Sequence, residues 1–130
     1  MQAFQFNHIA LAVKDVNESI AFYQKVFGLK EIENTASNSK TRWLSLNEGK
    51  ELHLIPKPEA TVQVVKEVHF ALATTDIHLF AKRLSALDIL YSDWLGTPEK
   101  IHIRKDGIKQ LYFQDPNGYW IEVNNIDKIQ

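Results

Sequence analysis

Cysteine is absent from the 130-residue sequence. Without thiols the protein cannot form disulfides, thiolate zinc sites or a cysteine nucleophile. Any metal ion must therefore be held by His, Asp or Glu side chains. The composition, 45% hydrophobic and 24% charged, is that of an ordinary folded protein, and the length predicts one domain over residues 1–130 with a sizeable core.

An excess of charge of one sign is also absent. The sequence has 15 Lys plus Arg and 16 Asp plus Glu, which gives a net charge of −1. Nucleic acids and anionic membranes attract proteins with a basic excess, so we expect no binding to either and a small-molecule or protein partner instead.

Long hydrophobic runs are missing as well. The first apolar stretch follows no basic leader, is interrupted by His8 and ends at Lys14 and Asp15. This pattern fits neither a signal peptide nor a membrane span, and we expect a cytoplasmic protein.

The chain instead contains an internal repeat. Residues 7–16 align with residues 68–77, so that His8 falls on His69. Both segments alternate between bulky apolar residues and a face of His, Ala and Ala, which predicts a half-buried strand. A repeat of this kind predicts two equivalent structural modules.

Each predicted strand is followed by a helical pattern and then by β-rich runs. Helices are expected over residues 19–27, stopped by Gly28, and over residues 77–87. The β-rich runs cover residues 29–35, 41–46 and 51–56 in the first half, and 89–94, 100–104 or 109–114, and 119–125 in the second. Each half therefore reads as strand, helix and three strands, an α+β arrangement.

Two closely spaced prolines, Pro56 and Pro58, separate the halves, because proline resists both helix and central strand. We predict a first module over about residues 5–56, a linker over 57–66 and a second module over 67–125.

The last strands of the two halves are aligned by the turns that precede them. Residues 47–50 match residues 115–118, and this match carries His53 onto Glu122. If the bulky strand faces cover the helices, the opposite, concave side carries four potential ligands: His8, His53, His69 and Glu122. Three imidazoles and a carboxylate suit a borderline divalent ion, namely Zn, Ni, Co, Mn or Fe(II), although each residue taken alone also fits a hydrogen-bonded structural role.

With these motifs in place, the sequence resembles the vicinal-oxygen-chelate superfamily of glyoxalases, bleomycin-resistance proteins and extradiol dioxygenases. The resemblance runs from about residue 7 to 125 and is carried by Asn7-His8-Ile9-Ala10-Leu11-Ala12-Val13, Ser19-Ile20-Ala21-Phe22-Tyr23, Phe27-Gly28-Leu29, Leu52-His53-Leu54, Val68-His69-Phe70-Ala71 and Tyr112-Phe113-Gln114-Asp115-Pro116-Asn117-Gly118-Tyr119-Trp120-Ile121-Glu122. It implies two tandem βαβββ modules whose curled mixed sheets form a metal-containing cup, usually in a homodimer. His8, His69 and Glu122 stand at the family's metal positions.

The resemblance implies a divalent-metal-dependent lyase or isomerase that acts on a small substrate chelating the metal through neighbouring oxygens. Glu122 and Glu51 are the expected catalytic residues, as proton carriers, although Glu51 also fits an exposed strand-end acid. The alternatives are an extradiol-type Fe(II) dioxygenase, a fosfomycin-type thiol transferase, and a non-catalytic small-molecule binding or resistance protein.

Strand parity places further residues on the concave side, where they would contact substrate, although core packing explains the aromatic ones equally well: Trp43, Ser45, Gln110, Tyr112 and Trp120. Curled open sheets also leave edges, and we expect a second copy to cover them in a homodimer.

His53 departs from the glyoxalase I-like pattern, which often has Glu or Gln at this place. Because one expected carboxylate beside the metal is replaced, the protein should form lactoylglutathione from methylglyoxal and glutathione weakly or not at all. A spectrophotometric assay of the metal-loaded protein measures this rate, and robust turnover would overturn the prediction.

Overall fold

A computed structural model describes residues 2–59 and 61–126 and divides the chain into two compact units, residues 1–62 and 63–130. Unit 1 contains β1 (His8–Val13), α1 (Val16–Phe27), β2 (Glu31–Ile32), β3 (Arg42–Ser45) and β4 (Glu51–Pro56). Unit 2 contains β5 (His69–Ala73), α2 (Ile77–Ala86), β6 (His102–Ile103), β7 (Lys109–Gln114) and β8 (Trp120–Asn124). None of the described helices has the length and apolarity to cross a membrane.

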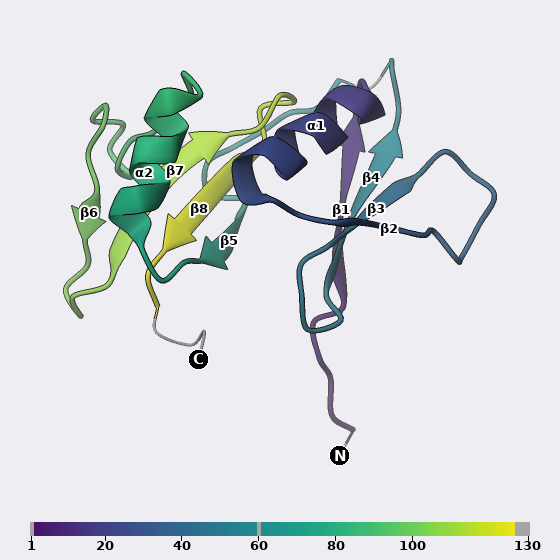
Figure 1. Ribbon diagram of the computed structural model, residues 1–130, viewed down its shortest axis with the longest axis horizontal. Coiled ribbons are helices and arrows are strands. Elements are labelled where there is room, and N and C mark those ends of the chain that lie inside the picture. The colour runs from purple at the N-terminus through teal and green to yellow at the C-terminus, as the bar shows by residue number, and fades with distance from the viewer. Residues whose placement is uncertain (1, 60, 127–130) are drawn as a thin grey trace. The chain divides into compact units, whose positions relative to one another are not determined.

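The two units have the same topology (Figure 1). Unit 1 forms a four-stranded sheet in the order β1-β4-β3-β2, and unit 2 forms one in the order β5-β8-β7-β6. In each sheet the first and last strands in sequence pair in parallel and the other pairs are antiparallel. The predicted α+β class and the two βαβββ modules with open mixed sheets are thus confirmed.

The register of the two parallel strand pairs agrees with the sequence alignment of residues 47–50 with residues 115–118, which matched His53 with Glu122. Ala10 pairs with His53 in unit 1, and Ala71 pairs with Glu122 in unit 2. Since Ala10 and Ala71 each stand two residues after the repeated histidine, His53 and Glu122 occupy the same place in the two sheets.

A helix covers one face of each sheet because the helix and the strands present matching apolar sides. In α1, Asp15 caps the first turn by accepting a hydrogen bond from the Glu18 amide at 3.1 Å, and Gly28 ends the helix with a φ of 67°. Tyr23, on the inner side of α1, is fully buried, as is Leu54 of β4. The polar histidine faces of β1 and β4 are left on the other side.

The same construction is seen in unit 2. The carboxylate of Asp76 accepts a hydrogen bond from the Leu79 amide at 2.9 Å and starts α2. The ring of Phe80 in α2 then lies 5.9 Å from that of Phe113 in β7, centroid to centroid. The residues that alternate with Phe113 must therefore face away from the helix.

The strand predicted over residues 89–94 is wrong. Only Ser92 forms a bridge there, by exchanging backbone hydrogen bonds with Tyr112 at 2.9 and 3.0 Å. Directly afterwards the Asp93 carboxylate accepts a hydrogen bond from the Thr97 amide at 2.8 Å, which turns the chain before a ladder can form. The edge strand of this sheet is β6, at residues 102–103.

Two neighbouring positions in β4 test which face holds the core. Leu54 is 0% exposed, whereas Ile55 is 41% exposed on the opposite face. Leu54→Ala should lower the free energy of unfolding by about 2–5 kcal/mol because it leaves a cavity, and Ile55→Ala by less than about 1 kcal/mol. Urea denaturation measures both values, and equal losses would contradict the assignment of the core.

Candidate functional site

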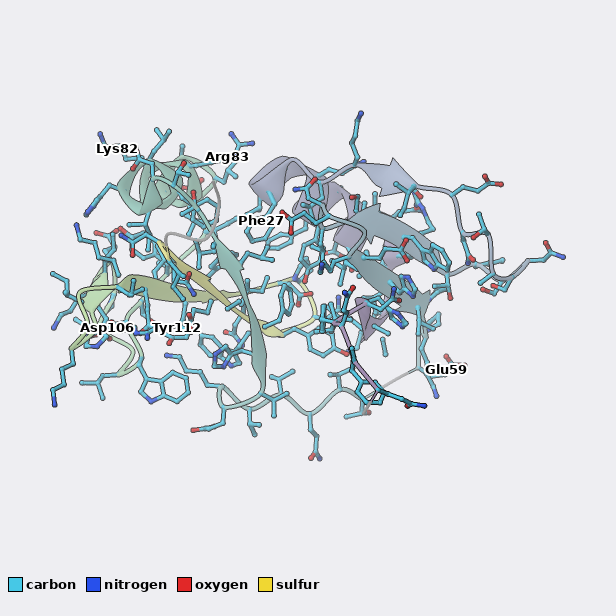
Figure 2. All side chains as sticks on the ribbon, turned by 90° about the horizontal axis from the view of Figure 1, so that it is seen from below. Phe27, Glu59, Lys82, Arg83, Asp106 and Tyr112 are labelled. Carbon is cyan, nitrogen blue, oxygen red and sulfur yellow. The ribbon has the colours of Figure 1, made fainter. Side chains whose placement is uncertain are left out.

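The polar face of the unit 2 sheet lies opposite α2. Figure 2 labels Lys82 and Arg83 on α2 and Tyr112 on the other side of the sheet. His69, Tyr112 and Glu122 come from β5, β7 and β8, and Tyr112 pairs directly with Glu122 in the ladder. Three neighbouring strands therefore direct polar groups to one surface.

Glu122 is the centre of this surface and is only 6% exposed. Its Oε1 accepts a hydrogen bond from the Tyr112 hydroxyl at 2.9 Å, and its Oε2 accepts one from Asn124 Nδ2 at 2.7 Å. The orientation of the Asn124 amide is fixed in turn, because its Oδ1 accepts a hydrogen bond from the Ile126 amide at 3.2 Å. Both carboxylate oxygens are thus held in place.

These contacts keep Glu122 ionised. Burial raises the pKa of Glu122, but hydrogen bonds from Asn124, Tyr112 and Gln110, together with the nearby His69 ring, outweigh burial and hold the pKa below its ordinary value of 4.5. Burial and the bond to Glu122 raise the pKa of the Tyr112 hydroxyl, which therefore remains a hydrogen-bond donor.

His69 faces Glu122 with its Nε2 nitrogen. The Nδ1 of His69 lies 2.8 Å from the Lys66 carbonyl oxygen, which can only accept, so Nδ1 carries the hydrogen. In the neutral ring Nε2 is then an acceptor, and it lies 3.3 Å from Glu122 Oε1. Two acceptors this close stabilise each other only when a proton or another cation lies between them.

Unit 1 carries a stack of three rings on the corresponding face. The His53 ring lies 4.1 Å from that of His8 and 4.2 Å from that of Trp43, with interplanar angles of 16° and 5°. His8 Nδ1 lies 2.7 Å from Asn7 Oδ1. That contact directs the Nδ1 hydrogen to Asn7 and leaves Nε2 of His8 as the nitrogen with a lone pair.

Glu51 and His53, predicted as a proton carrier and a metal ligand, contact each other. Their side chains join through Nε2 of His53 and Oε1 of Glu51, 2.9 Å apart, and the Glu51 side chain is 25% exposed. Glu51 is therefore a partner of the histidine stack and not an isolated acid at the end of a strand.

The other predicted contacts have varied surroundings. Ser45 accepts a hydrogen bond from the Asn47 amide at 3.1 Å and supports the turn before β4. Gln110 pairs with Asn124 in the ladder beside Glu122. Trp120 lies under the Lys66 ammonium, whose Nζ is 4.6 Å from the ring centroid.

Each unit thus carries two of the four predicted ligands. In the part of the chain that the structure describes, no group of three or more His, Asp or Glu side chains is arranged to hold a metal ion. The complete set of His8, His53, His69 and Glu122 stays a prediction.

Three residues of the unit 2 surface were not among the sequence-derived site residues. Asn124 alternates with Glu122, so strand parity alone could have found it. Lys66 falls in the predicted linker, where no periodicity indicates the direction of a side chain. Trp94 ends the run that was predicted as a strand over residues 89–94, and the structure has a turn there. Only the folded chain brings them to this face.

Comparison with known proteins gives the class. The model of the Glyoxalase/Bleomycin resistance protein/Dioxygenase superfamily matches residues 5–123. The chain belongs to this superfamily.

Individual relatives carry different activities in their names. The chain is 32% identical to Glyoxylase I 4 of Arabidopsis thaliana over 95% of its own length and 71% of that protein. It is 28% identical to the metallothiol transferase FosB of Lysinibacillus sphaericus, over 94% and 82% of the two chains. A FosX variant from Listeria monocytogenes, solved with Mn(II) and 1S,2S-dihydroxypropylphosphonic acid, has the same fold, with a TM-score of 0.74, 22% identity and coverage of 96% and 93%.

The Tyr112–Glu122 hydrogen bond can be tested through its dependence on pH. A carboxyl with a depressed pKa stabilises the fold above its unfolded pKa, and this contribution is lost as the pH falls through the folded pKa. Tyr112→Phe should lower the free energy of unfolding by about 1.5–3 kcal/mol at neutral pH, and the deficit should shrink in acid.

Urea denaturation across this pH range measures the effect, with Tyr91→Phe as the control outside the Glu122 network. A deficit that is the same at neutral and acidic pH would show that the Tyr112 hydroxyl does not act through the Glu122 charge.

Proposed function

We propose that the protein is a divalent-metal-dependent enzyme of the glyoxalase type, a lyase or isomerase for a small substrate that presents two neighbouring oxygens. The observation that carries this proposal is the approach of His69 Nε2 to Glu122 Oε1 at 3.3 Å. An imidazole lone pair and a buried carboxylate oxygen form a donor pair suited to Zn, Ni, Co, Mn or Fe(II).

The surroundings of the pair support its use as a metal site. The backbone carbonyl of Lys66 fixes the tautomer and ring plane of His69, and Tyr112 and Asn124 hold the carboxylate of Glu122. Outer partners of this kind orient metal ligands and maintain their basicity. His8 and His53 would complete the ligand set, from the same chain or from a second copy in a homodimer.

A bound divalent ion would act as a Lewis acid for the two substrate oxygens. Carboxylates of the protein would carry a proton to or from the substrate. Glu122 is ionised because its pKa is depressed, and its carboxylate can accept a proton. Glu51, joined to His53 at 2.9 Å, is a second carboxylate near the histidine stack. Trp43 and Trp120 would provide apolar walls for the substrate.

A thiol transferase is the second candidate. The similarity to FosB favours it, as does the Tyr-Phe-Gln-Asp-Pro run that starts at Tyr112. The two candidates share the metal and differ in whether a thiol adds to the substrate.

Metal titration tests the shared element of these candidates. Calorimetry with Zn, Ni, Co, Mn and Fe(II) should show at least one ion binding to the metal-free protein tighter than about 100 μM, or about 5.5 kcal/mol. His69→Ala should weaken binding by more than tenfold, and Glu122→Gln should weaken it because the charge is lost.

His78→Ala is the matched control, since His78 lies on α2 and contacts Lys109 Nζ at 3.0 Å instead of Glu122. This variant should bind like the parent. If no ion binds the parent more tightly than the stated limit, the proposed metal dependence is wrong.

A further inference from the structure

The ammonium of Lys66 lies among three aromatic rings on the same face as His69 and Glu122. Its Nζ is 4.6 Å from the ring centroid of Trp120 and 5.3 Å from those of Trp94 and Tyr112. Cation–π attraction to several rings at once restricts where the ammonium can lie.

Two hydrogen bonds fix the ammonium further. Nζ of Lys66 donates to the backbone carbonyls of Asp93 at 3.0 Å and of Trp94 at 2.8 Å. An ammonium has three protons, and the third has no acceptor among residues 2–59 and 61–126. A directed donor therefore remains available.

Lys66 also lacks an ion-pair partner in the part of the chain that the structure describes. The ion pairs formed by the described residues do not include Lys66. Asp93 holds the ammonium through its backbone carbonyl, but its carboxylate accepts a hydrogen bond from the Thr97 amide at 2.8 Å and lies 3.7 Å from Lys100 Nζ. A positive charge held between aromatic rings and lacking a carboxylate partner attracts an anion more strongly than one in open water.

The site continues from Lys66 to the proposed metal ligands. The ring of His69 lies 5.6 Å from that of Tyr112 and 6.0 Å from that of Trp94, which are two of the three rings around Lys66. Lys66 also orients His69 through its own carbonyl oxygen at 2.8 Å. One residue thus fixes a proposed ligand through its backbone and places a cation beside it through its side chain.

We propose that Lys66 binds an anionic group of the substrate, so that the substrate is a small acid with a carboxylate or similar group beyond the two oxygens that chelate the metal. This inference rests on the proposed function, since it extends the same site. The ammonium is a compact point charge on a flexible stem, and it therefore selects for charge more than for the shape of the anion.

The test compares ligands that carry this second anionic group with one that lacks it. Malate and its longer homologue α-hydroxyglutarate carry a second carboxylate, whereas α-hydroxybutyrate ends in a methyl group. Each is titrated by calorimetry into protein loaded with its tightest-binding metal ion. The parent should bind one or both diacids at least about tenfold more tightly than α-hydroxybutyrate, as expected for one charge-assisted hydrogen bond.

Three variants separate charge from structure. Lys66→Gln keeps a donor for the Asp93 and Trp94 carbonyls but removes the charge, so it should lose the preference for diacids while keeping its metal affinity. Lys66→Arg should retain most of the preference. Lys82→Gln, an exposed residue of α2, should behave like the parent. If Lys66→Gln keeps the preference for diacids, or weakens the binding of the metal and of all three acids equally, Lys66 only ties the loop to the sheet. The inference is then wrong.

A second readout does not depend on the metal. The measured quantity is the ratio of tryptophan fluorescence quenching by the anion iodide to quenching by neutral acrylamide. This ratio should be higher for the metal-free parent than for Lys66→Gln, because Trp94 and Trp120 surround the ammonium. Loss of this difference would overturn the inference even if metal binds. Its presence without metal binding would support Lys66 as an anion site and reject the proposed function.

Discussion

The arrangement of unit 2 depends on keeping the Glu122 carboxylate charged although it is nearly buried. Burying a neutral polar group without a hydrogen bond costs about 2–7 kcal/mol. Burying a charged carboxylate also costs several kcal/mol unless hydrogen bonds replace its hydration. Tyr112 and Asn124 supply these bonds from the neighbouring strand and from the same strand. Nε2 of His69 lies 3.3 Å from Oε1 of Glu122, and a proton or a metal ion between these two atoms makes the contact favourable.

The duplicated topology explains how two such surfaces arise in one short chain. In each unit the first strand carries a histidine, His8 or His69. The residue two positions further along that strand pairs with the second polar residue, His53 or Glu122, on the parallel neighbour. The alternation of strands then turns both to the face that the helix does not cover. The units differ in detail: aromatic stacking and Glu51 surround His53, whereas hydroxyl and amide donors surround Glu122.

The sequence was sufficient for the features that follow from periodicity. The structure has the predicted strand alternation and the predicted helix end at Gly28. It also has His53 and Glu122 at equivalent register positions in their two sheets. The conformation of the irregular segments could not be predicted from the sequence. The chain after Ser92 forms a loop because the Asp93 carboxylate closes a turn. Lys66 is held at the sheet by backbone carbonyls of this loop. Such contacts join distant segments and leave no periodic signal.

The account is tested most directly by nuclear magnetic resonance of the histidine rings, with long-range proton–nitrogen correlations before and after addition of zinc. The geometry predicts that neutral His69 in the metal-free protein carries its hydrogen on Nδ1, and that zinc shifts the Nε2 resonance of His69 while His78 is unchanged. A neutral His69 protonated on Nε2, with no zinc-induced shift, would contradict the claim that its lone pair and Glu122 form half of a metal site.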